Sequence, residues 1–392
     1  MSLVSQGVVT NMENGSMIRK MFEEGNRLRA IHGAENVFDF SLGNPDSEPP
    51  QETLDAIRSL ASQPNIHKYM PNAGFPDVRA RMAAFVSAGC KQTLSADQIV
   101  MTVGAAGGLN VAMKALLNPG EEVVVLAPYF VEYLFYIRNH GGVPRVVPTG
   151  DGFQPDPEAI RNAINEKTKA IILNSPNNPS GAVYGGEVLA RLAAVLAQKE
   201  KEIGHPIAVV SDEPYAALLY EGVLPSMMDY FPNALVVNSF SKTLSLPGDR
   251  IGYIAVNPQC ANLESLVNAL VFCTRTLGFV NAPGLMQRAV AASLEAKVNV
   301  DEYRARRDLL YDIVTQAGFT CTKPQGAFYL FPKSPIPDDA AFTESAAKHN
   351  LLLVPGSGFG APGYFRMAYC VSRETISRAR DAFMKLGAEY FG

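Results

Sequence analysis

A lysine accompanied by two serines and an arginine is the clearest candidate for covalent chemistry in this sequence. The apolar run 234–237 is followed by Ser239, Ser241 and Lys242. Arg250 lies eight residues after the lysine. An amine after a buried strand lies where open α/β sheets bind ligands, and it can form a Schiff base with an aldehyde cofactor. The two hydroxyls and the guanidinium suit a phosphate. A solvated lysine in a surface loop is the alternative.

Three more chemically useful residues follow apolar runs. Phe130 follows the run 122–126, Asn178 follows the run 170–173, and Asp212 follows the run 207–210. A carboxylate at a buried strand end needs a positive partner, and a protonated pyridine nitrogen would serve. An amide in a proline-rich turn can donate to a phenolate oxygen, and an aromatic ring can stack on a flat heterocycle. The alternatives are a helix N-cap for Asp212, a plain turn for Asn178 and core packing for Phe130.

Small residues also open a predicted helix after the strand that ends at Thr102. Gly104, Ala105 and Ala106 would let backbone N–H groups approach an anion, and the helix dipole would add attraction. The spacing matches neither the dinucleotide-binding nor the P-loop glycine pattern. A plain strand–helix turn is the alternative, but the amine, acid, amide, ring and phosphate cup together describe what pyridoxal phosphate requires.

The elements that must position these residues alternate along the chain from about residue 98. Short apolar runs without in/out alternation are typical of strands covered on both faces, so the fold class is α/β, with a mostly parallel central sheet flanked by helices. The predicted strands are 98–102, 122–126, 170–173, 207–210, 235–237 and 251–255.

The two ends of the chain differ in character from its middle. A helix is predicted over 16–31, and after about residue 285 a charged helix leads to isolated strands near 327–330 and 365–368. We therefore expect a large domain over 50–284. A smaller α+β domain would combine 1–49 with 285–392.

Composition excludes several classes of function. The chain has 392 residues, 47% of them hydrophobic, and a net charge of −4, so a basic surface for nucleic acid is not expected. No apolar run approaches the roughly 18–20 residues that span a bilayer, and no signal peptide is visible. Five scattered cysteines and five histidines suggest neither a disulfide framework nor a metal site. A cytoplasmic protein is the expectation.

The order and spacing of these residues resemble the class I/II aminotransferases, which are fold-type-I pyridoxal phosphate enzymes. The resemblance covers roughly residues 15–388. It is carried by the segments 177–181 (NNPSG), 212–215 (DEPY) and 239–242 (SFSK), together with Arg250.

The resemblance implies a role for each matching residue. Lys242 would hold pyridoxal 5'-phosphate and act as general base, Asp212 would keep the ring nitrogen protonated, and Asn178 and Tyr215 would bind the phenolic oxygen. Phe130 would stack on the ring. The phosphate would be held by Gly104, Ala105, Ala106, Ser239, Ser241 and Arg250, although Ala105 and Ala106 lack hydroxyls that some relatives have there.

Substrate binding and assembly are implied in the same way. Arg366 would clamp the substrate α-carboxylate with the backbone of Gly43 beside it, and Asn178 would also lie at the substrate. Tyr69 looks like the tyrosine that reaches a phosphate across a dimer interface, which implies a homodimer with shared active sites. Arg275 lies near where some relatives place a cross-subunit arginine for an acidic side chain.

The expected function is therefore transfer of an amino group between an L-amino acid and a 2-oxo acid, with a weak preference for aspartate and 2-oxoglutarate. Asp212, Tyr215 and Lys242 are the expected catalytic residues. A C–S lyase or related lyase with the same fold and cofactor is the nearest alternative. A cofactor-binding transcriptional sensor and a non-catalytic remnant are more distant alternatives.

Overall fold

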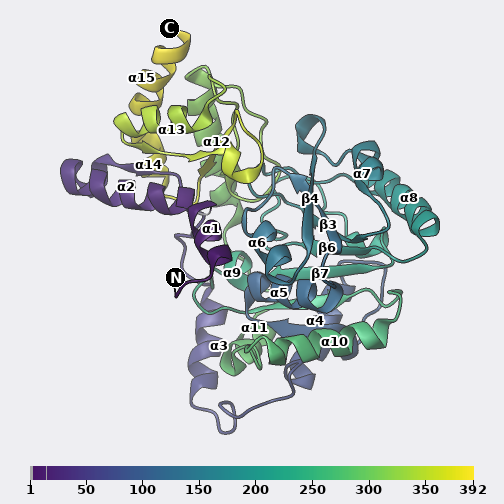
Figure 1. Ribbon diagram of the computed structural model, residues 1–392. Coiled ribbons are helices and arrows are strands. Elements are labelled where there is room, and N and C mark those ends of the chain that lie inside the picture. The colour runs from purple at the N-terminus through teal and green to yellow at the C-terminus, as the bar shows by residue number, and fades with distance from the viewer. Residues whose placement is uncertain (1–2, 15) are drawn as a thin grey trace.

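The computed structural model describes residues 3–14 and 16–392, without the side chains of residues 13–23. A central sheet with helices on both faces fills the larger part of the molecule, and elements from both ends of the chain lie together beside it (Figure 1). The helix predicted over 16–31 is present as α2 (Ser16–His32), preceded by α1 (Gln6–Asn14).

The central sheet has seven strands in the order β2-β8-β7-β6-β5-β3-β4. Their bounds are Ile99–Thr102 (β2), Glu122–Ala127 (β3), Val143–Pro148 (β4), Thr168–Asn174 (β5), Ala208–Asp212 (β6), Ala234–Ser239 (β7) and Gly252–Val256 (β8). β8 runs antiparallel to both of its neighbours, and the other strands run in one direction. The predicted mostly parallel sheet is confirmed, and the carboxyl ends of six strands meet at one edge.

Helices cover both faces of this sheet (Figure 1). They are α3 (Gln51–Ala61), α4 (Pro76–Ser87), α5 (Gly104–Leu116), α6 (Glu132–Asn139), α7 (Pro157–Ala163), α8 (Gly186–Ile203), α10 (Leu263–Thr276) and α11 (Gly284–Ala292). In β3, Val123 and Val125 pack with α5, α6 and α10, whereas Val124 and Leu126 pack with α4, α8 and α11. Burial on both sides explains why the apolar runs show no alternation.

Strand β4 is the one strand of the sheet that the sequence analysis does not predict. It lies at the sheet edge beside β3, and most of its residues are exposed or half-buried. Its sequence contains Pro144, Arg145 and Pro148. Prolines and a charged residue are tolerated at a sheet edge because one side of the strand forms no hydrogen bonds to another strand. The apolar run that marks a central strand is therefore missing from β4.

The second group of elements has its own core. A three-stranded sheet, β11-β12-β9, and a two-stranded parallel pair, β1-β10, pack with the C-terminal helices. The bounds are Phe38–Asp39 (β1), Tyr329–Leu330 (β9), Leu351–Leu352 (β10), Val354–Pro355 (β11), Phe365–Ala368 (β12), Val300–Gln316 (α12), Asp339–Lys348 (α13), Arg373–Arg378 (α14) and Arg380–Phe391 (α15). The strands predicted near 327–330 and 365–368 are therefore present.

The pairing of β1 with β10 joins the N-terminal segment to the C-terminal one. The domain division at 284/285 stays a prediction. Side chains of α11, just beyond that point, pack with the core of the central sheet. No helix within residues 3–14 and 16–392 is long and apolar enough to cross a membrane.

Candidate active site

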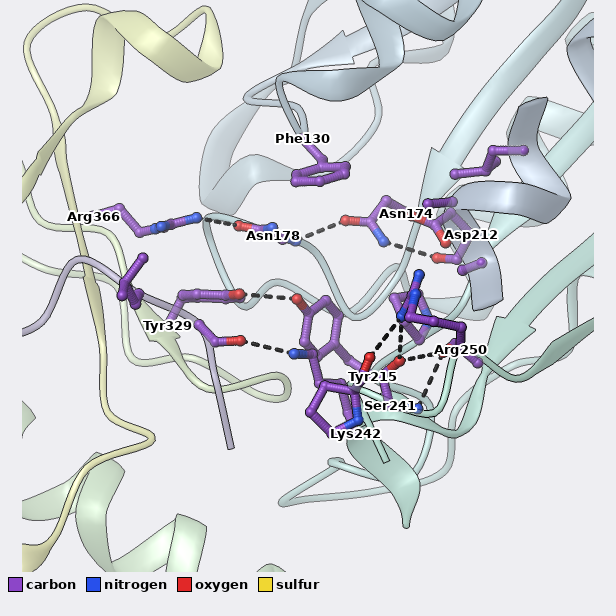
Figure 2. Close-up of a pocket in the computed structure, with 18 of the residues that line it drawn as sticks. Phe130, Asn174, Asn178, Asp212, Tyr215, Ser241, Lys242, Arg250, Tyr329 and Arg366 are labelled. Atoms are coloured by element: carbon purple, nitrogen blue, oxygen red, sulfur yellow. Dashed lines mark hydrogen bonds between the residues drawn. The ribbon is translucent and has the colours of Figure 1, made fainter. Parts of the chain in front are cut away.

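A cavity of about 330 Å³ opens at the carboxyl edge of the central sheet. Residues of the sheet region line it together with residues of the second group of elements, and Figure 2 shows their side chains turned toward one another. Most of the residues singled out in the sequence line it, namely Gly43, Ala105, Ala106, Phe130, Asn178, Asp212, Tyr215, Ser239, Ser241, Lys242, Arg250 and Arg366.

Lys242 lies in α9 (Phe240–Thr243), a single helical turn that follows β7 directly. Ser239 caps this turn by accepting a hydrogen bond from the backbone N–H of Ser241. The amine Nζ of Lys242 donates to the carbonyl oxygen of Gly43 at 2.7 Å. Burial lowers the pKa of Lys242 from 10.5 to about 8; Cys370 opposes this shift, and the charges of Arg250 and Arg366 add to it. About half of the amine is therefore neutral at about pH 8, and a smaller fraction is neutral near pH 7.

Asp212 is the last residue of β6 and is buried. Its Oδ2 accepts a hydrogen bond from the hydroxyl of Tyr133, whereas its Oδ1 has no partner among the described residues. Burial raises the pKa of Asp212 to about 7, and the bond from Tyr133 opposes that rise. A buried carboxylate oxygen without a donor is unfavourable by itself, so this atom is suited to a ligand that brings a positive N–H group.

Asn174, at the end of β5, holds two neighbouring backbone groups in place. Its Nδ2 donates to the carbonyl oxygen of Asp212 at 2.8 Å, and its Oδ1 accepts from the backbone N–H of Asn178 at 2.7 Å (Figure 2). These bonds tie the turn that carries Asn178 to the strand that carries Asp212. Asn178 and Asp212 are thereby held at the same edge of the sheet, after adjacent strands, with Asn174 between them.

A polar cup lies on the α5 side of Lys242. The hydroxyls of Ser239 and Ser241 are 2.7 Å apart, and Arg250 Nη1 approaches Ser241 Oγ at 3.5 Å and Pro247 O at 2.9 Å. Gly104 opens α5 with φ +68°, and a Cβ there would lie 2.7 Å from Arg250 Nη2. Glycine is therefore required both by the backbone and by the arginine. Two hydroxyls, a guanidinium and a helix N-terminus suit a phosphate.

Arg366, on β12, is buried on the opposite side of the cavity. Its Nη1 donates to Asn178 Oδ1 at 3.1 Å and its Nη2 to Ser41 O at 2.7 Å. The guanidinium lies between two aromatic rings, 4.7 Å from the centroid of Tyr329 and 4.7 Å from that of Phe359. Within the described structure its buried Nε has no acceptor. This orientation leaves one donor available for a carboxylate.

Tyr215 and Tyr329 close the cavity between Lys242 and Arg366. Their hydroxyls are 2.9 Å apart and share a hydrogen bond (Figure 2). Burial raises the pKa of Tyr215 well above its usual range, with Tyr329 as the next contribution. Tyr215 therefore stays protonated and can donate to a ligand oxygen at neutral pH.

Two of the predicted residues lie away from the cavity in the described chain. Tyr69 is 92% exposed. It lines a second pocket, which residues 66–70 form together with residues 279–285. Arg275 is exposed on α10, with its guanidinium 5.3 Å from the ring centroid of Phe272. Gly104 does not line the cavity but lies against Arg250, which does.

Four residues of the site, Tyr133, Asn174, Ser41 and Tyr329, have no role predicted from the sequence. Asn174 carries the same signal as Asp212, a polar residue that ends an apolar strand, and that rule could have found it. The other three act through contacts with residues distant along the chain. No local pattern indicates such contacts.

A family model described as aminotransferase class I and II matches residues 35–383. The aspartate/prephenate aminotransferase of Thermus thermophilus is 35% identical over 353 residues, which is 88% of this chain and 90% of the relative. The aspartate aminotransferase of Thermotoga maritima is 32% identical over 372 residues, or 93% of this chain and 95% of the relative.

Solved structures agree with these relatives. The crystal structure of an amino transferase from Eubacterium rectale matches with a TM-score of 0.97 and 39% identity, over 100% of both chains. The aspartate aminotransferase of Thermus thermophilus with maleate matches with a TM-score of 0.85 and 31% identity, over 95% of this chain and 96% of that one. The matches cover both the central sheet and the second group of elements.

Proposed function

Since the chain belongs to the class I and II aminotransferases, whose fold and pyridoxal phosphate dependence it shares, we propose that Lys242, Asp212 and Arg366 form its reacting centre. The observation that carries this proposal is that Asp212, Arg366 and Lys242 line one cavity, while Asp212 Oδ1 and Arg366 Nε are buried without a partner among the described residues. An anionic acceptor, a cationic donor and a nucleophile are thereby available to one ligand.

The residues of the cavity fit pyridoxal phosphate in their chemistry. Asp212 Oδ1 suits the protonated ring nitrogen, because it is buried and lacks a donor among the described residues. The cup of Ser239, Ser241 and Arg250 suits the phosphate. Phe130 lines the cavity and suits the ring face. When bound, the cofactor supplies an aldehyde that condenses with amines and a ring that takes up the electron pair left at the substrate α-carbon.

Lys242 would both hold the cofactor and move the proton. A lysine amine must be neutral to attack an aldehyde or to accept a proton, and its pKa of about 8 puts a useful fraction in that form near neutral pH. Once the substrate amine has displaced it, Nζ would take the proton from the substrate α-carbon. It would then return that proton to the cofactor carbon, and the second half of the reaction would reverse the path.

Arg366 would bind the α-carboxylate of the substrate. Its Nε is available, while its bonds to Asn178 and Ser41 and its two ring contacts fix the guanidinium plane. A fixed guanidinium orients a carboxylate in a way that a flexible ammonium cannot. Asn178 and Tyr215 would bind the phenolic oxygen of the cofactor.

Aspartate with 2-oxoglutarate is the substrate pair that we propose. The relatives from Thermus and Thermotoga are named for aspartate, and the Thermus structure contains the dicarboxylate maleate. Among the described residues that line the cavity, the cations are Lys242, Arg250 and Arg366. Each has a role above, so a second carboxylate needs a cation from elsewhere, and Arg275 of a second copy is the candidate.

A homodimer and a cytoplasmic location complete the proposal. Tyr69 is almost fully exposed and lies outside the cavity of its own chain, which favours a contact with the phosphate of a second copy. In the part of the chain that the structure describes, all five cysteines are free thiols, which suits a reducing compartment.

Borohydride reduction of the enzyme saturated with pyridoxal phosphate tests the central assignment. Peptide mapping should find the reduced cofactor on Lys242. The Lys242→Ala variant should lose the visible absorbance band and transamination, whereas the exposed Lys297→Ala control should keep both. A label on another residue, or transamination by Lys242→Ala, would refute the assignment. Continued turnover beyond one equivalent of product per site without a 2-oxo acid acceptor would indicate a lyase instead.

A further inference from the structure

Tyr133, on α6, contacts two of the residues that are proposed to meet the cofactor ring. Its hydroxyl donates to Asp212 Oδ2, and its ring packs edge-on against Phe130, with the centroids 5.6 Å apart and the planes at 84°. Its backbone N–H also donates to Phe130 O at 3.1 Å. Tyr133 is 2% exposed. One buried side chain thus touches both the carboxylate and the aromatic ring.

The hydrogen bond from Tyr133 determines which oxygen of Asp212 is left for a ligand. Oδ2 is occupied by the phenol, and Oδ1 is the buried oxygen without a partner among the described residues. Asn174 Nδ2 fixes the backbone of Asp212 through the carbonyl oxygen. With the backbone and one carboxylate oxygen held, the carboxyl group cannot rotate without breaking the bond to Tyr133.

Tyr133 remains a donor under all ordinary conditions. Burial raises the pKa of its phenol well above its usual range, and the neighbouring Asp212 raises it further. The bond in turn opposes the rise in the pKa of Asp212 that burial causes. The phenol therefore stabilises the ionised form of Asp212, which is the form that attracts a protonated ring nitrogen.

Building on the proposed function, we propose that Tyr133 is a positioning residue that holds Asp212 ionised with Oδ1 directed at the ring nitrogen of pyridoxal phosphate. The effect of Tyr133 on cofactor affinity should then depend on whether the cofactor contains that ring nitrogen. A purely structural residue would affect every cofactor of the same shape alike. This difference separates the two roles experimentally.

Two cofactors that differ in a single atom provide the test. The apoenzyme is titrated with pyridoxal phosphate and with its 1-deaza analogue, in which carbon replaces the ring nitrogen, and the two dissociation constants are compared. The wild-type enzyme should prefer pyridoxal phosphate. Tyr133→Phe keeps the ring that packs on Phe130 but removes the donor, so it should reduce the preference about tenfold, the effect of one hydrogen bond to a charged group. Its affinity for the analogue should stay within about twofold of wild type.

Matched variants control the comparison. Tyr220→Phe also removes a buried phenol hydroxyl, one that donates to Ala327 O, and should leave the preference unchanged. Phe130→Leu removes the stacking ring and should weaken both cofactors equally. Thermal melting of each apoenzyme checks that it is folded.

The outcomes separate this inference from the proposed function. Asp212→Ala should abolish the preference; if it does not, the proposed role of Asp212 fails. If Asp212→Ala abolishes the preference but Tyr133→Phe retains it, the role of Tyr133 is refuted alone. Equal weakening of both cofactors by Tyr133→Phe would likewise show that the tyrosine only packs.

Discussion

The amine of Lys242 donates a hydrogen bond to the carbonyl oxygen of Gly43, 2.7 Å away and 199 residues apart in sequence. The lysine follows a strand of the central sheet, whereas Gly43 lies between β1 and α3, on the segment that enters the sheet region from the second group of elements. A Cβ at Gly43 would overlap the hydroxyl of Tyr329. This glycine therefore lets the chain pass close to Tyr329, and the contact of its carbonyl oxygen with the Lys242 amine joins the two parts of the molecule at the site.

The pH dependence of cofactor capture should reflect the lowered pKa of Lys242. Only the neutral amine attacks an aldehyde, so the rate at which the apoenzyme captures pyridoxal phosphate should rise with pH, with a midpoint at about 8 rather than 10.5. Stopped-flow absorbance measures this rate. Arg366→Met removes a nearby positive charge and should move the midpoint to higher pH. An unchanged midpoint in that variant would contradict the contribution of Arg366.

Asp212 should destabilise the apoenzyme at neutral and alkaline pH. Burial raises its folded-state pKa from 3.8 to about 7, so the stability that its protonated form contributes is present at low pH and is lost as the pH rises through about 7. Asp212→Asn should therefore increase the free energy of unfolding of the apoenzyme at about pH 8, by at most about 4 kcal/mol for a shift of about three units. At about pH 4 the change should be small. Urea unfolding at the two pH values measures it.

The holoenzyme provides the control for this effect of Asp212. With pyridoxal phosphate bound, the carboxylate gains a cationic partner, and the same Asp212→Asn substitution should destabilise the protein. Stabilisation of both forms would contradict the pairing.

Phe359 should contribute to carboxylate binding through Arg366. Phe359→Leu removes one of the two rings that enclose the guanidinium, and a cation–π contact of about 1 kcal/mol corresponds to a KM for the amino acid about fivefold higher. Steady-state kinetics and cofactor titration measure the two affinities. Since Phe359 does not line the cavity in the described chain, cofactor affinity should be unchanged; an equal loss of both would indicate general disruption.

Hybrid dimers should reveal whether Tyr69 acts in a second copy. Tyr69→Phe is expected to weaken cofactor binding, and Lys242→Ala to abolish activity. If the tyrosine of one copy serves the lysine of the other, mixing the two variants creates one site with both native residues. Half of the sites in each hybrid should then have wild-type cofactor affinity. Hybrids that retain only the weakened affinity would place Tyr69 in its own chain's site or outside it.

Arg275 should discriminate dicarboxylate substrates from others. Arg275→Ala should reduce kcat/KM for aspartate by about tenfold or more, the effect of losing a charge-assisted pair, and should leave alanine or phenylalanine nearly unaffected. A panel of amino acids with 2-oxoglutarate as acceptor measures this difference. If aspartate is unaffected, the proposed cross-subunit contact is wrong.

The sheet and the main polar residues of the site were predictable from local patterns. Strands such as β5 and β6 are short apolar runs, and Asp212 ends one of them. The edge strand β4 was not predictable in this way, because its two prolines and its exposed arginine remove the apolar signal. Strand direction was predictable only as mostly parallel, since β8 is reversed.

The sequence by itself determined which reactive groups are present and at which strand ends they lie, because burial in the sheet selects apolar runs and the chain must turn after each one. Only the tertiary structure decided how those groups are held. The bond from Tyr133 to Asp212, the rings around Arg366 and the contact of Lys242 with Gly43 all join residues that are far apart in sequence. Such contacts depend on packing between elements, and packing also sets the burial that shifts the pKa of Lys242 and Asp212.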